Sequence, residues 1–179
     1  MRSKQYVICN MLLYLLLLGC SSIFAGCSMN DDEDDNAEVT EKVKVGDLVP
    51  LFTVTMTYPE TTDSQQEQAT RQWSTMHLKG QTVIVFFNTS CKDCQRDLPQ
   101  LNQYYLEHKD EPDFQMVAIS REENKESVAA YWATNGLVIP YSPQDDRMIY
   151  SLFATSIIPR IYFCTDNVVT RVDIEKFGI

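Results

Sequence analysis

Hydrophobic and polar residues alternate in different ways along the chain, and each pattern predicts an element. Phe52 to Thr57 places apolar side chains on every second position, which is typical of a strand with one buried face. Residues 82–87 are a continuous run of β-branched and aromatic side chains with one threonine at its start. Such a run is typical of a strand buried on both faces. Residues 114–119 form a second strand of the same kind.

Apolar residues at helical spacing follow each of these two strands. A helix is predicted from about Cys91 to His108, with Leu98, Leu101 and Tyr104 on one side and Pro99 as an internal kink. A second helix is predicted over 126–135, with Gly136 as its C-cap. Residues 146–154 predict a third, short helix.

The remaining segments complete an α/β pattern. Residues 59–72 are polar and predict a loop within an N-terminal hairpin whose return segment is 73–80. Residues 161–164 and 168–172 predict a hairpin around the turn Thr165-Asp166-Asn167. Strands that alternate with helices predict a central β-sheet with both faces covered.

The first 27 residues resemble a bacterial lipoprotein signal peptide. Arg2 and Lys4 precede an apolar stretch over 7–18, which is too short to span a bilayer as a helix but has the length of a secretory core. Small residues then precede Cys20 and again Cys27, as in a lipobox, whose cysteine is acylated after cleavage. We favour Cys27, with Cys20 as the alternative, because an acidic run follows Cys27 and resembles the export signal of surface lipoproteins in Bacteroides-like bacteria.

Charge separates the next segment from the folded part. Residues 28–42 contain seven acidic side chains and no aromatic one, which predicts an extended, disordered tether between the signal peptide (1–27) and one domain (43–179). The whole chain of 179 residues has a formal charge of −10. An acidic chain has no general means of neutralising phosphates, so we expect no nucleic-acid partner.

Cys91 and Cys94 stand where the first buried strand meets the predicted helix. The unpaired N–H groups and dipole of a helix N-terminus stabilise a thiolate, and the second cysteine lies one turn further along on the same side. This arrangement predicts a reactive thiol with a sheltered partner that can resolve a mixed disulfide.

Two other interpretations of the pair stay open. A zinc site needs a second pair of ligands, and Cys164, His77 and His108 do not supply one at matching spacing, so we expect no metal. A structural disulfide is the other interpretation, since secreted domains use them. Cys164 lies in an apolar strand and is interpreted as an inert core residue.

The segment from Cys91 to Pro99, placed after residues 83–87, resembles the active-site segment of the thioredoxin-like TlpA/ResA proteins, which are membrane-tethered thiol–disulfide oxidoreductases. Residues 46–52 (GDLVPLF) are similar to the opening motif that this branch shares with AhpC/TSA proteins. Ser156 to Pro159 resembles the cis-proline loop of the family. The resemblance covers about residues 45–173 and implies a thioredoxin-like α/β fold with a central mixed sheet, helices on both faces and an N-terminal hairpin.

The resemblance also implies roles for single residues. Ile158 and Pro159 are expected to bind the substrate, because the residue before the proline offers its backbone to an extended client strand. Asp97 lies three positions after Cys94. The family often places an acid there as proton acceptor for the buried thiol, and we expect Asp97 to have this role, with a solvated helix-face charge as the alternative.

Three departures from the family pattern are visible. Ser90 replaces the tryptophan that commonly precedes the first cysteine, which alters exposure of the site. Arg160 replaces the threonine after the proline and is expected to bring charge close to the cysteine pair and its clients. The sequence stops at Ile179, so the final helix of the family is expected to be missing, with one sheet face left exposed or covered by a partner.

The residues and the resemblance together predict a cofactor-free thiol–disulfide oxidoreductase. Its expected location is the cell envelope, as an outer-membrane lipoprotein on the periplasmic or cell-surface side. Protein disulfides or dithiols are its expected clients, and a membrane electron donor is the expected partner. Two alternatives remain: a non-catalytic binding lipoprotein with a structural disulfide, and an AhpC/TSA-type peroxidase. A peroxidase needs Thr or Ser three residues before its reactive cysteine, where this chain has Asn88.

Overall fold

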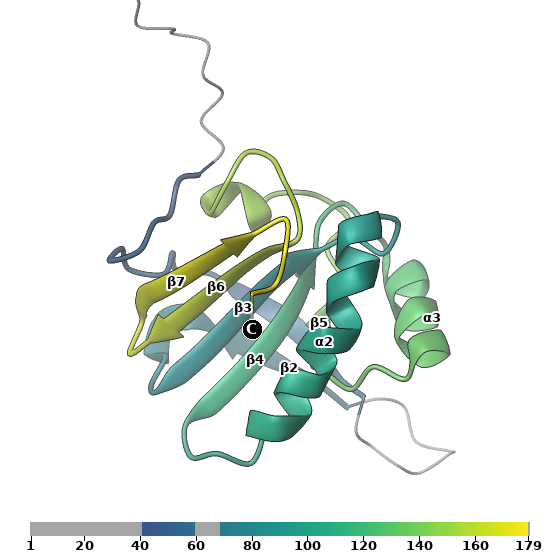
Figure 1. Ribbon diagram of the computed structural model, residues 1–179, viewed down its shortest axis with the longest axis horizontal. Helices are drawn as coiled ribbons and strands as arrows, with labels where there is room; N and C mark the ends of the chain where they lie inside the picture. Colours follow the sequence, from purple (N-terminus) through teal and green to yellow (C-terminus); the bar gives the residue numbers. More distant parts are fainter. Residues whose placement is uncertain (1–40, 60–68, 179) are drawn as a thin grey trace, which may run out of the picture. The chain divides into compact units, whose positions relative to one another are not determined.

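A single mixed β-sheet organises the protein (Figure 1). The computed structural model describes residues 41–59 and 69–178. Within these residues the sheet has seven strands in the order β2-β1-β5-β4-β3-β6-β7. The central mixed sheet with helices that the sequence predicts is therefore confirmed.

The elements alternate in the order that the apolar runs indicate. The strands are β1 (Thr53–Tyr58), β2 (Ala69–Ser74), β3 (Gln81–Phe87), β4 (Phe114–Ser120), β5 (Tyr141–Ser142), β6 (Arg160–Thr165) and β7 (Val168–Ile174). The helices are η1 (Thr75–His77), α2 (Lys92–His108), α3 (Lys125–Asn135) and η2 (Tyr150–Leu152), of which η1 and η2 are 3-10 helices.

Strand β3 is the centre of the sheet. It pairs in parallel with β4 on one side and antiparallel with β6 on the other, so both of its edges and both of its faces are covered. All of its residues except Gln81 are buried. A strand in this position must be apolar on both faces, which is why 82–87 has no polar alternation.

Both α-helices lie on one face of the sheet. Trp132 of α3 packs on Phe87 with ring centroids 4.8 Å apart, and Tyr104 of α2 meets Phe163 at 6.2 Å. Phe163 pairs across with Val83, which points to the same side of β3 as Phe87. The two successive crossovers, β3-α2-β4 and β4-α3-β5, continue in one direction along the sheet and therefore place their helices on the same side (Figure 1).

The opposite face is covered by aromatic residues around η2. Phe86 contacts Tyr150, Phe153 and Tyr162, with ring centroids 5.4, 4.8 and 6.1 Å away. Phe52, from the segment before β1, meets Phe153 at 5.8 Å. A 3-10 helix and the N-terminal segment thus complete the core on the side that α2 and α3 leave uncovered.

Several boundaries differ from the predicted ones. The return strand β2 begins at Ala69, inside the segment predicted as loop, and pairs with β1 from Tyr58 to Thr53. Only Tyr150–Leu152 of the predicted helix over 146–154 is helical, and it is 3-10. Strand β5 was not predicted, because two residues are too few to show a period. Gly136 is the C-cap of α3 in the left-handed conformation, as predicted.

Residues 41 and 42, just before the predicted domain start at residue 43, already contact the folded part of the chain. Glu41 forms an isolated antiparallel bridge with Ala154, and the Lys42 N–H donates to the Phe153 carbonyl at 2.9 Å. The predicted signal peptide and the tether up to residue 40 lie outside the described residues. Within 41–59 and 69–178, no helix is long and apolar enough to cross a membrane.

The residues after β7 cover part of the helical face. Phe177 is only 3% exposed and packs between Tyr104 and Phe163, with centroids 5.8 and 6.3 Å away. The face beside α2 is therefore not bare at this point, contrary to one of the two outcomes expected from the sequence. The Phe177 side chain excludes water from this part of the sheet, as a packed helix would.

Cys164 of β6 lies on the other face of the sheet, the side of Phe86, and is 3% exposed. Burial raises the pKa of its thiol from 9.0 to about 12, because the thiolate loses its hydration. An unfolded chain would release this proton near its ordinary pKa, whereas the folded chain holds it. The contribution of this thiol to the free energy of unfolding is therefore fully present below about pH 9 and is lost as the pH rises toward 12.

We expect the reduced protein to lose more stability than a Cys164→Ala variant when the pH is raised from about 8 to about 10. One buried thiol contributes at most about 1.4 kcal/mol per pH unit above its unfolded pKa. Urea unfolding under reducing conditions at both pH values measures the difference. Equal losses of unfolding free energy in the wild type and the variant would show that the Cys164 thiol has the same pKa in the folded and unfolded chain.

Candidate functional site

The loop that follows β3 is held by polar side chains. The Asn88 carbonyl oxygen Oδ1 accepts the Ser90 N–H at 2.9 Å, and Asn88 Nδ2 donates to the Arg121 carbonyl at 3.0 Å. The Thr89 N–H donates to Glu123 Oε2 at 2.8 Å. These bonds connect the loop to the residues after β4, so the carboxyl ends of the two parallel strands fix the start of α2. Glu123 was not singled out from the sequence, although its place just after a buried strand was a usable signal.

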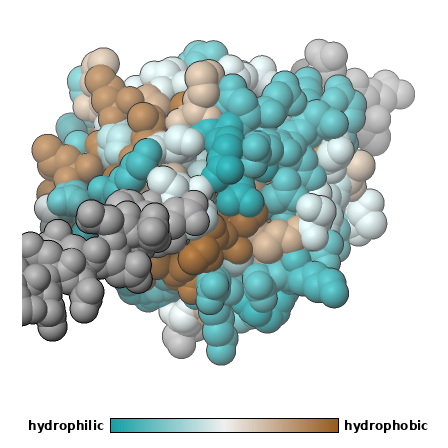
Figure 2. Space-filling view, turned by 90° about the horizontal axis from the view of Figure 1, so that it is seen from above, coloured by the Kyte–Doolittle hydropathy of each residue, from teal (hydrophilic) through white to brown (hydrophobic). Residues whose placement is uncertain are grey.

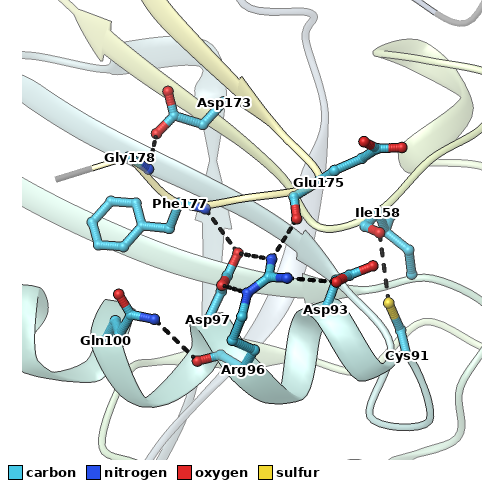
Figure 3. A network of polar contacts seen from close by, with 10 residues as sticks. All are labelled: Cys91, Asp93, Arg96, Asp97, Gln100, Ile158, Asp173, Glu175, Phe177 and Gly178. Atoms are coloured by element: carbon cyan, nitrogen blue, oxygen red, sulfur yellow. Dashed lines mark hydrogen bonds and ion pairs between the residues drawn. The ribbon is translucent and has the colours of Figure 1, made fainter.

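Cys91 is the N-cap residue of α2 and is half-buried. Its carbonyl accepts the first helical bond, from the Gln95 N–H at 2.9 Å, while its side chain caps no N–H group. The sulfur instead lies 3.5 Å from the carbonyl oxygen of Ile158 (Figure 3). The predicted position of Cys91, at the amide end of the helix and facing the proline loop, is confirmed.

Cys94 lies one turn further along α2 and is fully buried. Burial raises the pKa of its thiol well above the ordinary value, and the neighbouring Cys91 and Asp97 raise it further. Cys91, Cys94 and Cys164 are all free thiols. The site therefore combines a reachable sulfur with one that holds its proton until a base removes it.

Asp97 is buried on the same helix, with 1% of its side chain exposed. Its carboxylate accepts Arg96 Nε at 2.6 Å, Arg96 Nη2 at 3.1 Å and the Phe177 N–H at 2.8 Å (Figure 3). A carboxylate has about four lone-pair positions, so three N–H donors leave about one for a further proton donor. The solvated helix-face position that was the alternative for Asp97 is wrong.

Arg96 connects this carboxylate to two other parts of the structure. Its Nη1 donates to Asp93 Oδ1 at 2.6 Å, and its Nη2 donates to the Glu175 carbonyl at 2.5 Å (Figure 3). The hydrogen bond from Arg96 to Asp97 raises the pKa of the guanidinium. Sequence reasoning missed Arg96; its spacing from Asp93, three residues along a helix, was the available signal.

Ile158 and Pro159 are joined by a cis peptide bond, as the resemblance implies. Arg160, which follows them, is wholly buried, and its Nη2 donates to the Ser156 carbonyl at 3.1 Å. A client cannot touch a side chain with no exposed surface, so the expectation that Arg160 meets clients is wrong. Its place on the strand explains the burial, because Arg160 and Tyr162 point to the same aromatic face of β6.

Metal-ligating side chains do not gather elsewhere in the described part of the chain. Among residues 41–59 and 69–178, no group of three or more His, Cys, Asp or Glu side chains is arranged to hold a metal ion. His108, one of the two histidines, pairs with Glu111 at 2.7 Å near the far end of α2.

Figure 2 shows the end of the molecule where β3 ends and α2 begins. Hydrophobic and hydrophilic residues both reach this surface, and the hydrophobic ones form separate areas between polar ones. Exposed apolar side chains in the elements that end or begin nearby include Leu152 of η2 and Ile174 of β7.

Comparison with known proteins agrees with this geometry. The AhpC/TSA family model matches residues 45–169. The thiol-disulfide oxidoreductase ResA of Bacillus thuringiensis is 24% identical over 120 residues, which are 66% of this chain and 62% of that protein. The chain thus matches somewhat less than two thirds of the length of this curated relative.

Solved structures extend the comparison to the whole fold. A Bacteroides thetaiotaomicron protein assigned as a protein disulfide isomerase superposes with a TM-score of 0.65 at 21% identity, covering 79% of this chain and 85% of that one. AhpC of Mycobacterium bovis superposes with a TM-score of 0.56 at 15% identity, covering 76% and 83%. With the family model matched over most of the sequence, the chain belongs to the AhpC/TSA family and has a thioredoxin-like fold.

Proposed function

We propose that the protein is a thiol–disulfide oxidoreductase that exchanges disulfides with other proteins through Cys91 and Cys94. The observation that carries the proposal is the position of Cys91, half-buried at the N-terminus of α2 with its sulfur 3.5 Å from the Ile158 carbonyl. Cys94 stands one turn behind it, fully buried. The similarity to ResA supports the same activity.

Cys91 and Cys94 act in two successive steps of the proposed reaction. The Cys91 thiolate attacks one sulfur of a client disulfide, the client S–S bond breaks, and the second client sulfur leaves and takes up a proton. Cys94 then gives its proton to a base, attacks the Cys91 sulfur and releases the first client sulfur. The client has gained two electrons and two protons, and Cys91 and Cys94 are joined as a disulfide. A membrane electron donor would return the pair to its dithiol form.

Asp97 is the proposed base in the second step. It is buried close to Cys94, whose pKa it helps to raise, and three N–H donors hold its carboxylate in place. A proton that burial keeps on Cys94 must be removed before this sulfur can attack. A fixed carboxylate with acceptor capacity left can take it.

A peroxidase is the second candidate, because the family model includes such proteins and AhpC shares the fold. The side chain three residues before Cys91 is Asn88, whose amide is engaged with Ser90 and the Arg121 carbonyl. It offers no hydroxyl at the place where a peroxidase of this family needs one. The geometry therefore favours disulfide exchange over peroxide reduction.

We expect the reduced protein to reduce insulin disulfides and a Cys91→Ala variant to have no turnover, because Cys91 is the sulfur that a client can reach. The reduction potential of the pair is expected between roughly −270 and −120 mV. Equilibration with a glutathione redox buffer measures it. A much lower potential without insulin turnover would identify a structural disulfide, and peroxide consumption would identify a peroxidase.

We expect Asp97→Asn to slow the second step, the release of the client from the mixed disulfide, by on the order of 10²-fold. The amide keeps the size of the carboxylate but cannot accept the Cys94 proton. Asp93→Asn is the matched control, since Asp93 also pairs with Arg96 but is exposed. Stopped-flow release of a labelled client peptide separates the two variants. The same rate in both would remove Asp97 from the mechanism.

We also propose that the chain is a lipoprotein of the outer membrane, anchored through Cys27. The apolar stretch over 7–18, the small residues before Cys27 and the acidic run after it support this location. The site would then face clients in the envelope.

We expect metabolic labelling with radioactive palmitate to be lost in Cys27→Ser and retained in Cys20→Ser, because only the acylated cysteine carries the lipid. The reverse result would place the anchor at Cys20. Labelling of neither the wild type nor the variants would show that the chain is not a lipoprotein.

A further inference from the structure

Each main-chain carbonyl of the loop over 155–159 accepts a hydrogen bond. Thr155 accepts from Arg147 Nη2, Ser156 from the Tyr150 hydroxyl and from Arg160 Nη2, and Ile157 from the same Tyr150 hydroxyl at 2.8 Å. The Pro159 carbonyl accepts the Glu175 N–H at 2.9 Å. Between these fixed positions, the Ile158 carbonyl faces the Cys91 sulfur.

The donor to the Ile158 carbonyl is the Cys91 thiol, whereas the other carbonyls of this loop accept from groups that keep their protons. A thiol donates a hydrogen bond only while it carries its proton, and Cys91 must lose that proton before it can attack a disulfide. Formation of the thiolate thus releases the Ile158 carbonyl, which then needs another donor. An N–H group of a client strand lying beside the loop is such a donor.

Tyr150 holds the two carbonyls that come just before Ile158. It is 1% exposed, and its ring lies against Phe86 and beneath the guanidinium groups of Arg121 and Arg147, which are 5.1 and 5.8 Å from its centroid. These contacts fix the ring, so its hydroxyl is a rigid donor. Its one hydroxyl proton is shared between the Ser156 and Ile157 carbonyls, both of which lie within hydrogen-bond distance.

Ile157 shows why such a donor is needed. Its φ is +69°, in the left-handed region, which is unfavourable for a β-branched residue. A residue keeps this conformation only where surrounding contacts impose it, and such residues cluster at binding sites. The Tyr150 hydroxyl, which donates to the Ile157 carbonyl, is one such contact.

We propose that Tyr150 is a positioning residue for client binding: its hydroxyl holds Ile157 in the left-handed conformation and thereby aims the Ile158 carbonyl at the space beside Cys91. The inference rests on the proposed disulfide exchange. Tyr150 does not touch the reacting sulfurs. Its removal should therefore weaken the binding of an extended client and leave the reactivity of Cys91 unchanged.

The test compares Tyr150→Phe with Tyr162→Phe. Tyr162 is also buried in the aromatic face, and its hydroxyl donates to the Phe153 carbonyl at 3.3 Å and is hydrogen-bonded to Arg160, but neither contact is to a carbonyl of the loop over 155–159. Tyr150→Phe should raise KM for a peptide disulfide about tenfold, with kcat and the alkylation rate of Cys91 by iodoacetamide unchanged. Tyr162→Phe should leave KM unchanged.

A second variant tests the link to Ile157. Asn tolerates the left-handed conformation better than Ile, so Tyr150→Phe should raise KM less in an Ile157→Asn background than in the wild type. Arg147→Met, which removes the half-exposed donor to Thr155, should raise KM in the same direction by a smaller factor.

The outcomes separate the two levels of the proposal. Turnover that does not depend on Cys91 would overturn the proposed function itself. Turnover that depends on Cys91, with the same KM in Tyr150→Phe and Tyr162→Phe, would overturn only the positioning role. A slower alkylation of Cys91 in Tyr150→Phe would also overturn it, because the loop would then act on the thiol rather than on the client.

Discussion

The contact between the Cys91 sulfur and the Ile158 carbonyl is the interaction on which the site depends. It joins two segments that are 67 residues apart in the chain. One is the start of α2, where unpaired N–H groups favour a negative sulfur. The other is a loop whose carbonyl is suited to an incoming strand. In the proposed disulfide exchange, this contact brings the cysteine pair beside the surface that would hold a client.

The two faces of the sheet supply the two halves of the site. The face with α2 and α3 carries the cysteines and Asp97, and it is closed near β7 by Phe177. The aromatic face around Phe86 carries Tyr150, which holds the proline loop. Strand β3 lies between both layers and leads directly into the loop that carries Cys91.

The buried carboxylate of Asp97 connects the chemistry to the folding of the last residues. A charged group without water must be compensated by hydrogen bonds or by an opposite charge. Arg96 supplies the charge, and the Phe177 N–H supplies a further bond. Residues 175–178 therefore do more than cover apolar surface, because one of their main-chain groups is part of the environment of the proposed base.

Sequence patterns predicted the elements that local physics controls. The buried strands β3 and β4, the helix that begins at Cys91 and the C-cap at Gly136 follow from apolar runs and from the preferences of single residues. The CxxC spacing likewise places Cys94 one turn behind Cys91. These features depend on neighbours a few residues apart, which is what a pattern records.

Tertiary contacts decided which side chains surround the cysteine pair and the proline loop. Arg160 is charged, yet it is wholly buried because its strand position faces the aromatic layer. Asp97 is also buried, and the main chain at Phe177, 80 residues further along, donates to its carboxylate. Tyr150 looks in the sequence like any core aromatic residue, and only the fold brings its hydroxyl to the Ile157 carbonyl. The sequence by itself determined the strand–helix frame and the place of the cysteine pair at the start of α2. Which groups surround that pair depends on contacts between distant segments, and these form only when the sheet is assembled.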